Sequence, residues 1–513
     1  MKKNNIALLL MSGLMAVALC ACGGPKSDAG SSDDANTSRA DNNEIVVGIA
    51  QDLGDSLDPN QMSAAGTREV LFNVYEGLYK PDSTGDFKPA LAESYEVSDD
   101  GLVYTFTIRD GVMFHNDTAM DVADVVYSFN NCAAHSVDSS QAAALSNVAK
   151  VEALDEKTVQ ITLSEPNSDF LAYVASVYIV PDDYTELVTM PVGTGPFKFV
   201  SRSVQENVVM EKFAGYWGEG AKVDKVTFNI YEDSNAMMTA LNGGAVDLVM
   251  HLSVSQTQNL SNQYEILEGT MNLVQALYLN NAVKPFDDVR VRQALSYAVD
   301  VDSLLDLTAD GHGTKLGSSM YPAFGKYFDD SLTDYYTYDP EKAKALLAEA
   351  GYANGFDMTI IAPSNYTPHV DAAQVLVEQL NAVGIRASLQ EVEWNTWLQD
   401  VYSGREFEAT VVGFDAANLT ANALLQRWTT ESSKNMINFS NAEYDQLIAQ
   451  ASASTDDEER VALYKRAEAI LTEQAANVYI QDLADMVAIN KNLTGFEFYP
   501  LYVMDLSNVA YVK

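Results

Sequence analysis

Cysteine is scarce in this chain, with three residues, Cys20, Cys22 and Cys132, among 513. Two of them, Cys20 and Cys22, stand at the end of an apolar N-terminal stretch, and we expect Cys22 to be chemically modified. That leaves Cys132 without a partner for an intramolecular disulfide. The fold must therefore be held by its hydrophobic core, and we interpret Cys132 as a small buried apolar side chain.

Basic residues are also few. There are 31 Lys and Arg against 72 Asp and Glu, which gives a net charge of −41. A surface this acidic repels nucleic acids and anionic lipid headgroups, so a nucleic-acid partner is excluded. The acidity indicates solubility outside the cell, and attraction of cationic ligands is the alternative.

Signatures of catalysis are missing. Gly193 and Gly195 precede Pro196 and Phe197, so they do not form a phosphate-binding loop. His115, with Asp117 and Asp121, resembles a metal cluster, but we interpret it as structural. We predict no enzyme activity, no cofactor and no metal. The histidines lie apart, without ligand spacing, at positions 115, 135, 251, 312 and 369.

Long apolar runs are absent beyond the N-terminus, so a second membrane segment is not expected. At the N-terminus, Lys2 and Lys3 precede an apolar run from Ile6 to Ala18, which is typical of a secretory signal peptide. The following Leu19-Cys20-Ala21-Cys22 resembles the bacterial lipobox. This resemblance implies that residues 1–21 are removed and that Cys22 carries a diacylglycerol, which anchors the chain to the outer face of a cell membrane. An ordinary secretory signal is the alternative.

Residues 22–43 are rich in Gly, Ser, Asp and Asn, and they predict a flexible tether. The remainder is too long for a single hydrophobic core, so two or three domains are expected. Residues 44–50 predict a buried strand, and residues 67–75 a helix. Alternating strands at 102–108 and 159–163, with a helix capped by Asp121 between them, predict a small α+β unit.

From Phe286 onward the pattern is regular α/β. Asp339-Pro340 predicts the start of a helix that ends at Gly351, and Thr367-Pro368 the start of one that ends at Gly384. Strands at 358–361 and 385–389 enclose the second helix, which predicts parallel pairing. A further helix is expected at 396–403 and a strand at 409–412. Later helices are expected around 444–451 and 461–471.

Six blocks along the chain resemble the family 5 extracellular solute-binding proteins, the peptide, nickel and oligosaccharide receptors of ABC importers. The resemblance implies an α/β, periplasmic-binding-protein-like, two-lobed fold with an extra α+β domain II and a discontinuous domain I. The blocks are residues 91–129, VGTGPFKF at 192–199, LNGGAVDLV at 241–249, residues 278–300, DPEKAKALLAEAGY at 339–352 and NFSNAEYDQL at 438–447.

The same resemblance implies the domain limits and the partners. Domain I comprises residues 44–75, 186–275 and 481–513, domain II residues 76–185, and domain III residues 276–480. The ligand, a small molecule or peptide, sits between domains I and III, which close around it. The closed form then delivers it to the transmembrane subunits of an ABC permease, and the protein is expected to be a monomer.

Several residues are candidates for ligand contact. The loop 62–67, with the candidates Met62, Ala65 and Thr67, follows the first strand, and its small residues would let backbone groups approach a ligand. Trp394 and Trp397 lie just after a parallel strand, at the edge where α/β sheets present ligand sites, although core packing is the alternative. Asn280, in the block 278–300, is a further candidate.

One departure from the family pattern concerns the ligand's ammonium group. The resemblance implies Gly-Trp followed by an Asp three residues beyond the aromatic, and that Asp pairs with the α-ammonium of a peptide. Here Phe414 follows Gly413, and Ala417 stands at the Asp position. We predict that Asp415 takes over this contact, with Asn418 as the alternative. An Asp that is solvated, or that caps a helix over 419–428, is the competing interpretation.

The predicted function is capture of an oligopeptide or a similar organic solute for import. The alternatives are a surface hydrolase and a receptor that senses a peptide signal. A non-peptide ligand such as an oligosaccharide or a nickel chelate also stays open.

Overall fold

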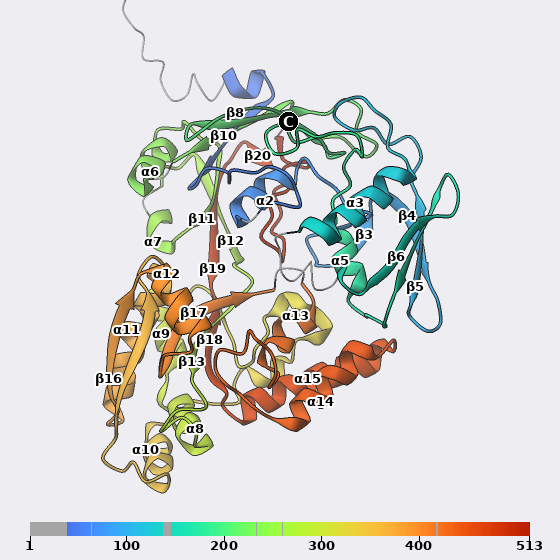
Figure 1. The fold of residues 1–513 in the computed structure, drawn as a ribbon. Helices are drawn as coiled ribbons and strands as arrows, with labels where there is room; N and C mark the ends of the chain where they lie inside the picture. The colour runs from blue at the N-terminus through green and yellow to red at the C-terminus, as the bar shows by residue number, and fades with distance from the viewer. Residues whose placement is uncertain are drawn as a thin grey trace, which may run out of the picture.

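The computed structural model describes residues 38–512 except 63, 137–144, 232, 259 and 417–418. Three sheets organise these residues, and we name the surrounding structures the seven-stranded, four-stranded and six-stranded units (Figure 1). Among the described residues, no helix has the length and apolar character needed to cross a bilayer. The predicted signal peptide, Cys22 and most of the tether lie outside the described residues.

The seven-stranded sheet gathers segments from three distant parts of the chain. Parallel β1 pairs with β10 on one side and β11 on the other, and the remaining strands add antiparallel. Its order is β12 (Tyr264–Thr270), β19 (Ala484–Asn490), β11 (Leu248–Leu252), β1 (Glu44–Ile49), β10 (Lys225–Ile230), β9 (Asn207–Lys212) and β8 (Phe197–Ser203). Its helices are α2 (Ala65–Leu71), α6 (Ser234–Asn242) and α7 (Val254–Thr257), and the short β20 (Leu493–Thr494) and β21 (Ala510–Tyr511) pair nearby.

The end of the predicted tether is fixed to this unit. The Arg39 guanidinium donates to the carboxylate of buried Asp247 at 2.9 Å and to the carbonyl of Gly244 at 2.8 Å. Asn43 donates to the carbonyl of Lys222 at 3.0 Å. The chain therefore joins the fold at Arg39 rather than at Glu44, because the charge of Asp247 needs a partner once it is buried.

The four-stranded sheet is antiparallel, with α3 (Val122–His135) and α5 (Phe170–Ser176) beside it and the hairpin of β2 (Tyr79–Pro81) and β3 (Phe87–Pro89) next to it. Its order is β4 (Ala92–Val97), β5 (Val103–Ile108), β7 (Thr158–Leu163) and β6 (Val148–Ala153). The predicted cap of α3 is confirmed: Asp121 accepts from the amide of Ala123 at 2.7 Å, and the Asp124 carboxylate accepts from the amide of Asp121 at 2.9 Å. Cys132 is buried, as predicted.

The six-stranded sheet contains the predicted βαβ unit. β15 and β16 pair in parallel with α11 between them, and β17 pairs in parallel with β15. The order is β14 (Thr314–Lys315), β18 (Asn477–Asp482), β13 (Leu273–Leu279), β17 (Ala409–Asp415), β15 (Asp357–Pro363) and β16 (Arg386–Val392).

The helices predicted for the six-stranded unit are present, with a difference at one place. The predicted helix 396–403 is instead the short α12 (Trp394–Thr396) followed by the π-helix η3 (Trp397–Ser403). The others are α8 (Val289–Ala298), α9 (Val301–Ala309), η1 (Pro322–Tyr327), η2 (Asp330–Leu332), α10 (Pro340–Glu349), α11 (Thr367–Ala382), α13 (Ala421–Leu425), η4 (Gln426–Trp428), α14 (Ala442–Ala453) and α15 (Asp457–Glu473).

The hydrophobic cores divide the molecule into two lobes. One core cluster is shared by the seven-stranded and four-stranded units; it includes Val47, Phe106 and Phe228. The six-stranded unit has its own clusters on the two faces of its sheet, one around Tyr278 and the other around Leu277. None of these clusters, in the described part of the chain, contains residues of both lobes, so the lobes can move relative to each other without breaking a core.

The chain passes between the lobes at two points. β12 ends at Thr270 and β13 begins at Leu273, while β18 ends at Asp482 and β19 begins at Ala484. The carboxylate of Asp482, fully buried, accepts from the amide of Leu273 at 3.1 Å, so it ties one connection to the other. The exact domain limits expected from the sequence stay a prediction.

The glycines of the VGTGPFKF block have a packing reason. A Cβ on Gly193 would lie 2.1 Å from the carbonyl oxygen of Val74. The same carbonyl accepts from the amide of Gly195 at 2.9 Å. The segment therefore runs directly against the chain after α2, which explains why glycine stands there although no phosphate-binding loop is present.

Candidate functional site

A cavity of about 190 Å³ lies where all three units meet, and we call it the small cavity. The seven-stranded unit supplies the loop after β1, helix α2 and the C-terminal segment 501–503. The four-stranded unit supplies α5 and the hairpin next to it, and the six-stranded unit supplies Asp415 and Ala416. The small cavity therefore lies between the two lobes.

The predicted loop after β1 forms part of this wall. Met62 and Ala65 both line the small cavity, whereas Thr67 does not. Thr67 is buried, and its hydroxyl accepts from the amide of Gly54 at 2.7 Å, so it holds the loop in place. Two of the three predicted loop residues are thus at the cavity, and the third supports them.

Asp415 is the last residue of β17, and its exposed side chain lines the small cavity. Its pairing with Leu273 continues the regular register of β13 and β17, so the strand needs no bulge to bring Asp415 to the cavity. The helix-capping interpretation is wrong, because the cap of α13 is Thr420, whose hydroxyl accepts from the amide of Ala423. β15, β16 and β17 end at this same edge of the sheet, where α/β folds bind ligands.

Arg68 brings a positive charge to the opposite wall. It belongs to α2, and its guanidinium donates to the carbonyl of Met62 at 3.4 Å. Burial raises the pKa of the Tyr178 hydroxyl, and the nearby charge of Arg68 opposes that shift. The sequence interpretation missed Arg68 because the predicted loop stopped at Thr67; a basic residue on the first helix after that loop was the available signal.

Several aromatic side chains also belong to the wall. Phe72, Phe87, Tyr178 and Tyr502 line the small cavity. The Tyr178 ring stacks on Tyr75 with centroids 5.6 Å apart, which fixes its orientation. Such rings can pack against apolar side chains of a ligand while their polar edges stay available for hydrogen bonds.

Behind Tyr502 lies a cluster of buried charges. The His251 ring stacks on Tyr502 with centroids 4.7 Å apart. Its Nε2 lies 2.8 Å from Glu69 Oε1, and its Nδ1 lies 3.1 Å from the carboxylate of Asp485. Burial opposes protonation of His251, but hydrogen bonds and charges of Asp485 and Glu69 outweigh it and raise its pKa to about 10. The protonated ring joins α2, β11 and β19 directly behind the cavity wall.

Two other predicted residues are buried away from the small cavity. Asn280 is buried and donates to the carbonyls of Arg405 and Phe407, both at 3.1 Å. Trp397 is also buried, and its indole donates to the hydroxyl of Thr410 at 3.0 Å. These positions belong to the core of the six-stranded unit.

Trp394 and Phe414 are partly exposed but do not line the small cavity either. Trp394 stacks on Trp397 with centroids 5.1 Å apart. The Arg427 guanidinium lies 4.1 Å from the centroid of Phe414. Asn418, the alternative to Asp415, lies outside the described residues.

His115, the histidine of the suspected metal cluster, contacts the VGTGPFKF segment. The two ring nitrogens of His115 contact the carbonyl of Gly195 at 3.0 Å and the amide of Gly193 at 3.3 Å. Burial lowers the pKa of His115 to about 4, so the ring is neutral at pH 7. In the described part of the chain, no group of three His, Cys, Asp or Glu side chains is arranged to hold a metal ion.

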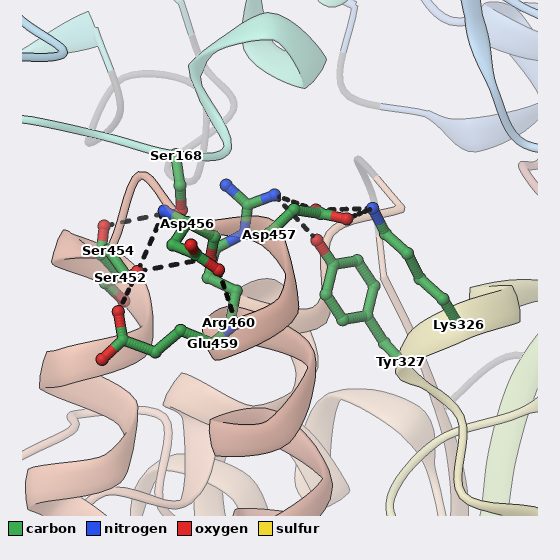
Figure 2. Close-up of polar contacts among 9 residues, drawn as sticks. All are labelled: Ser168, Lys326, Tyr327, Ser452, Ser454, Asp456, Asp457, Glu459 and Arg460. Atoms are coloured by element: carbon green, nitrogen blue, oxygen red, sulfur yellow. Dashed lines mark hydrogen bonds and ion pairs between the residues drawn. The ribbon is translucent and has the colours of Figure 1, made fainter. Parts of the chain in front are cut away.

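A second cavity, of about 910 Å³, lies between the four-stranded and six-stranded units, and we call it the large cavity. Its six-stranded wall carries a polar network (Figure 2). Lys326 Nζ and Arg460 Nη2 each lie 2.6 Å from the carboxylate of Asp457, and Arg460 also donates to the Tyr327 hydroxyl at 3.2 Å. Ser168, on the opposite side, donates to the carbonyl of Ser452 at 3.5 Å.

Asp169 faces this network from the four-stranded unit. Burial raises the pKa of Asp169 to about 6, while the charge of Arg460 and a hydrogen bond from Thr420 oppose the shift. Asp169, Thr420 and Arg460 all line the large cavity, so its polar groups come from both lobes.

The chain matches known proteins along most of its length. Residues 86–436 match the model for bacterial extracellular solute-binding proteins, family 5. The chain belongs to this family, the solute-binding components of ABC importers, and its two lobes have the periplasmic-binding-protein fold.

Among its relatives, heme-binding protein A of Haemophilus influenzae is 31% identical over 471 residues, covering 84% of this chain and 85% of that protein. The glutathione-binding protein GsiB of Escherichia coli is 30% identical over 477 residues, covering 89% and 92%. The solved structure of DppA from Helicobacter pylori in complex with the peptide STSA has a TM-score of 0.76 at 27% identity, covering 92% of this chain and 98% of that one. That of CtaP from Listeria monocytogenes has a TM-score of 0.83 at 25% identity, covering 92% and 99%.

Proposed function

We propose that this protein captures oligopeptides, or a closely similar organic solute, between its two lobes and delivers them to an ABC permease. The observation that carries the proposal is the small cavity, whose wall includes Asp415 of one lobe, Arg68 of the other and several aromatic side chains. Asp415 suits an ammonium group, and the guanidinium of Arg68 suits carbonyl or carboxylate oxygens. A peptide offers these groups together with side chains for the aromatic rings.

The names of the relatives support a peptide-like ligand. The structure of DppA from Helicobacter pylori holds a peptide, and GsiB of Escherichia coli is named for glutathione, itself a tripeptide. The relatives are named as binding proteins, which supports a role without chemistry on the ligand. Binding would stabilise the closed arrangement of the lobes, because only that arrangement contacts the ligand from both sides.

Identification of co-purifying ligands tests this function. The mature protein, purified without denaturation, is expected to release peptides that mass spectrometry detects. The same peptides should raise the melting temperature with concentration, since a ligand at a hundredfold excess over its dissociation constant adds about 2.7 kcal/mol to the free energy of unfolding. Time-dependent cleavage of the bound peptide would instead indicate the surface hydrolase. Release of a heme, an oligosaccharide or a nickel chelate, with no peptide, would refute the peptide assignment.

We further propose that the protein is a lipoprotein on the outer face of the cell membrane and acts there as a monomer. The basic start, the apolar run and the lipobox-like residues that end at Cys22 support this location. A diacylglycerol supplies two acyl chains, which is enough for stable attachment, whereas one chain gives only reversible binding. The receptor would thereby stay close to the permease.

Replacing Cys22 tests the anchor. Cys22→Ser removes the thiol that accepts the lipid, so we expect the protein to stay unprocessed or to appear in the medium. Cell fractionation with washing in the absence of detergent measures the membrane-bound share. Cys132→Ser is the matched control, because Cys132 is buried in the four-stranded unit and should not affect retention. Equal retention of wild type and Cys22→Ser would refute lipid anchoring.

A further inference from the structure

We propose that a polar contact between the lobes, away from the small cavity, is a latch that protonation tightens, so that acidity favours closure of the lobes. We call it the interlobe latch. It comprises Ser168 and Asp169 of the four-stranded unit and Thr420, Ser452 and Arg460 of the six-stranded unit. None of these five residues lines the small cavity. The inference rests on the proposed function and adds to it a condition that regulates how tightly the ligand is held.

Two neighbouring residues bring the four-stranded unit to the latch. The Ser168 hydroxyl donates to the carbonyl of Ser452 at 3.5 Å, from one lobe to the other (Figure 2). Asp169 directly precedes α5, where an Asp often caps a helix, but its side chain makes no capping bond to α5. The carboxylate instead faces the other lobe, where the hydroxyl of Thr420 donates to it.

The six-stranded side of the latch is held by bonds within its own unit. Thr420 is buried, and its hydroxyl also accepts from an amide in the first turn of α13 at 3.1 Å. The Arg460 side chain is 15% exposed, and it binds Asp457 at 2.6 Å and the Tyr327 hydroxyl at 3.2 Å (Figure 2). These bonds do not depend on the other lobe, whereas the contact with Asp169 requires that the lobes are together.

Closure takes the Asp169 carboxylate out of water. An ionised carboxylate loses much more hydration on burial than a neutral one, so burial favours the protonated form. The charge of Arg460 and the bond from Thr420 offset part of this effect, and the pKa of Asp169 still rises to about 6 from an ordinary value of 3.8. Tyr104 on β5 and Tyr464 on α15 also face Asp169. Burial raises the pKa of both hydroxyls, that of Tyr104 to about 12, so both are neutral at pH 7.

The raised pKa of Asp169 determines the direction of the effect. When the lobes separate, the six-stranded wall is withdrawn and the carboxylate meets solvent, so its pKa returns toward the ordinary value. The closed arrangement therefore holds the proton more tightly than the open one, and protonation stabilises closure. This contribution is complete below pH 3.8 and is lost as the pH rises through about 6. From pH 7 to pH 5, closure should become up to about tenfold more favourable.

A disulfide-trapping experiment measures closure without any ligand. A Cβ on Gly101, in the four-stranded unit, would lie 3.2 Å from Cγ2 of Thr455 in the six-stranded unit, so cysteines at these two positions are within reach of a disulfide when the lobes are closed. The pair is introduced into the mature chain together with Cys22→Ser. At pH 7 and a fixed oxidant concentration, adding Asp169→Asn should accelerate trapping at least about tenfold, because the neutral amide imitates the protonated carboxyl.

Retention of peptides at two pH values measures the consequence for binding. The probe is a random-sequence tetrapeptide pool with free termini and without Asp, Glu or His, so its charge changes little between pH 7 and pH 5. It is equilibrated with the mature protein, and the retained fraction is quantified by mass spectrometry. Wild type should retain severalfold more at pH 5, up to about tenfold, and Asp169→Asn should change by less than about twofold.

Two further variants complete the design. Asp169→Ser is a second neutral substitution that should act like Asp169→Asn, which keeps the test valid if one of the two folds poorly. Asp371→Asn is the matched control. Asp371, on α11, is also half-buried with a pKa raised by burial, but it lines neither cavity, so this variant should keep the trapping rate and the pH dependence of wild type.

The outcomes separate the latch from the proposed function. Equal trapping rates for wild type and both Asp169 variants, or the same pH dependence of retention in all of them, overturn the latch and leave peptide capture intact. A trapping response with peptide retention that does not depend on pH overturns it as well, because closure would then not control binding. If no protein retains the pool at either pH while trapping still responds to Asp169, the peptide assignment fails and the latch stands.

Discussion

His251→Gln is expected to lower the free energy of unfolding by about 3–5 kcal/mol, toward the lower end of that range. The substitution removes the positive charge between Glu69 and Asp485, whose side chains are only 6% exposed. Two buried carboxylates are then left close together without a cation, which costs more than the loss of an exposed ion pair. The lower end applies because 26% of the His251 side chain is exposed, so solvent screens part of its charge.

Urea denaturation of the mature protein at pH 7 measures this effect. His312→Gln is the matched control, because His312 pairs with Glu268 at 3.0 Å on the surface. An exposed pair contributes at most about 1 kcal/mol, so the control should unfold close to wild type. Adding Asp485→Asn to His251→Gln should recover part of the loss, since it removes one of the two repelling charges. Equal midpoints for His251→Gln and His312→Gln would refute the buried charge cluster.

The same cluster gives a pH dependence with a definite sign. The pKa of His251 is raised to about 10 in the folded protein, against an ordinary value of 6.5. Its stabilising contribution is therefore complete below pH 6.5 and is lost as the pH rises through 10. The difference between wild type and His251→Gln should shrink over that interval. Glu69, Asp485 and the ring of Tyr502 face His251, and the hydroxyl of Tyr502 has its pKa raised by burial and by both carboxylates, so it stays neutral there. A difference that does not change with pH would contradict protonation of His251.

The position of His251 gives this cluster a functional consequence. Its ring stacks on Tyr502, which lines the small cavity, and its partners lie on α2 and β19. α2 also carries Arg68, and β19 begins directly after the connection between the lobes. The protonated ring therefore links Tyr502, in the wall of the small cavity, to α2 and to the start of β19.

Much of the six-stranded unit was predictable because its signals are local. Asp339 accepts from the amide of Lys342 at 2.9 Å and starts α10, and Gly351, with φ of 93°, ends it. The strands around α11 pair in parallel, as the βαβ pattern predicts. Caps and turn glycines act within a few residues, so the sequence alone reveals them.

The seven-stranded sheet was much less predictable. β1 pairs with β10 some two hundred positions along the chain, at Glu44 and Lys225, and β11 pairs with β19, at Leu248 and Ile489. No local pattern specifies such partners, although the family resemblance indicated that the C-terminus returns to the first domain. For the same reason Tyr502 and His251 were not predicted at the site.

The direction in which a side chain points was the other feature that the sequence did not predict. Trp394 and Trp397 were predicted at the ligand edge of the sheet, and they do follow β16. Trp397, however, turns inward, because its indole N–H donates to the hydroxyl of Thr410 and its ring packs in the core. A tryptophan at the start of a helix can point either way, and the sequence does not distinguish the two. Asp415 stands at a strand end, where a charged side chain has fewer possible directions.

Asp415→Asn is expected to weaken binding of peptides with a free N-terminus by about 10- to 100-fold. Asp415 ends β17 at the cavity edge, and a charge-assisted hydrogen bond to an ammonium contributes about 1.5–3 kcal/mol. The amide of Asn keeps the shape but loses the charge. Because the Asp415 side chain is exposed, the substitution should leave the free energy of unfolding nearly unchanged.

The discriminating experiment combines two proteins with two ligands, and isothermal titration calorimetry measures the affinity of each combination. A peptide identified by mass spectrometry is compared with its N-acetylated form, on wild type and on Asp415→Asn. If Asp415 binds the ammonium, acetylation weakens binding to wild type and has little further effect on the variant, because both changes remove the same contact. Asp400→Asn, an exposed carboxylate of η3 away from both cavities, is the matched control and should bind as wild type does. Equal affinity of wild type for both peptide forms would show that no ammonium is recognised, and the small cavity would then be assigned to neutral solutes such as oligosaccharides.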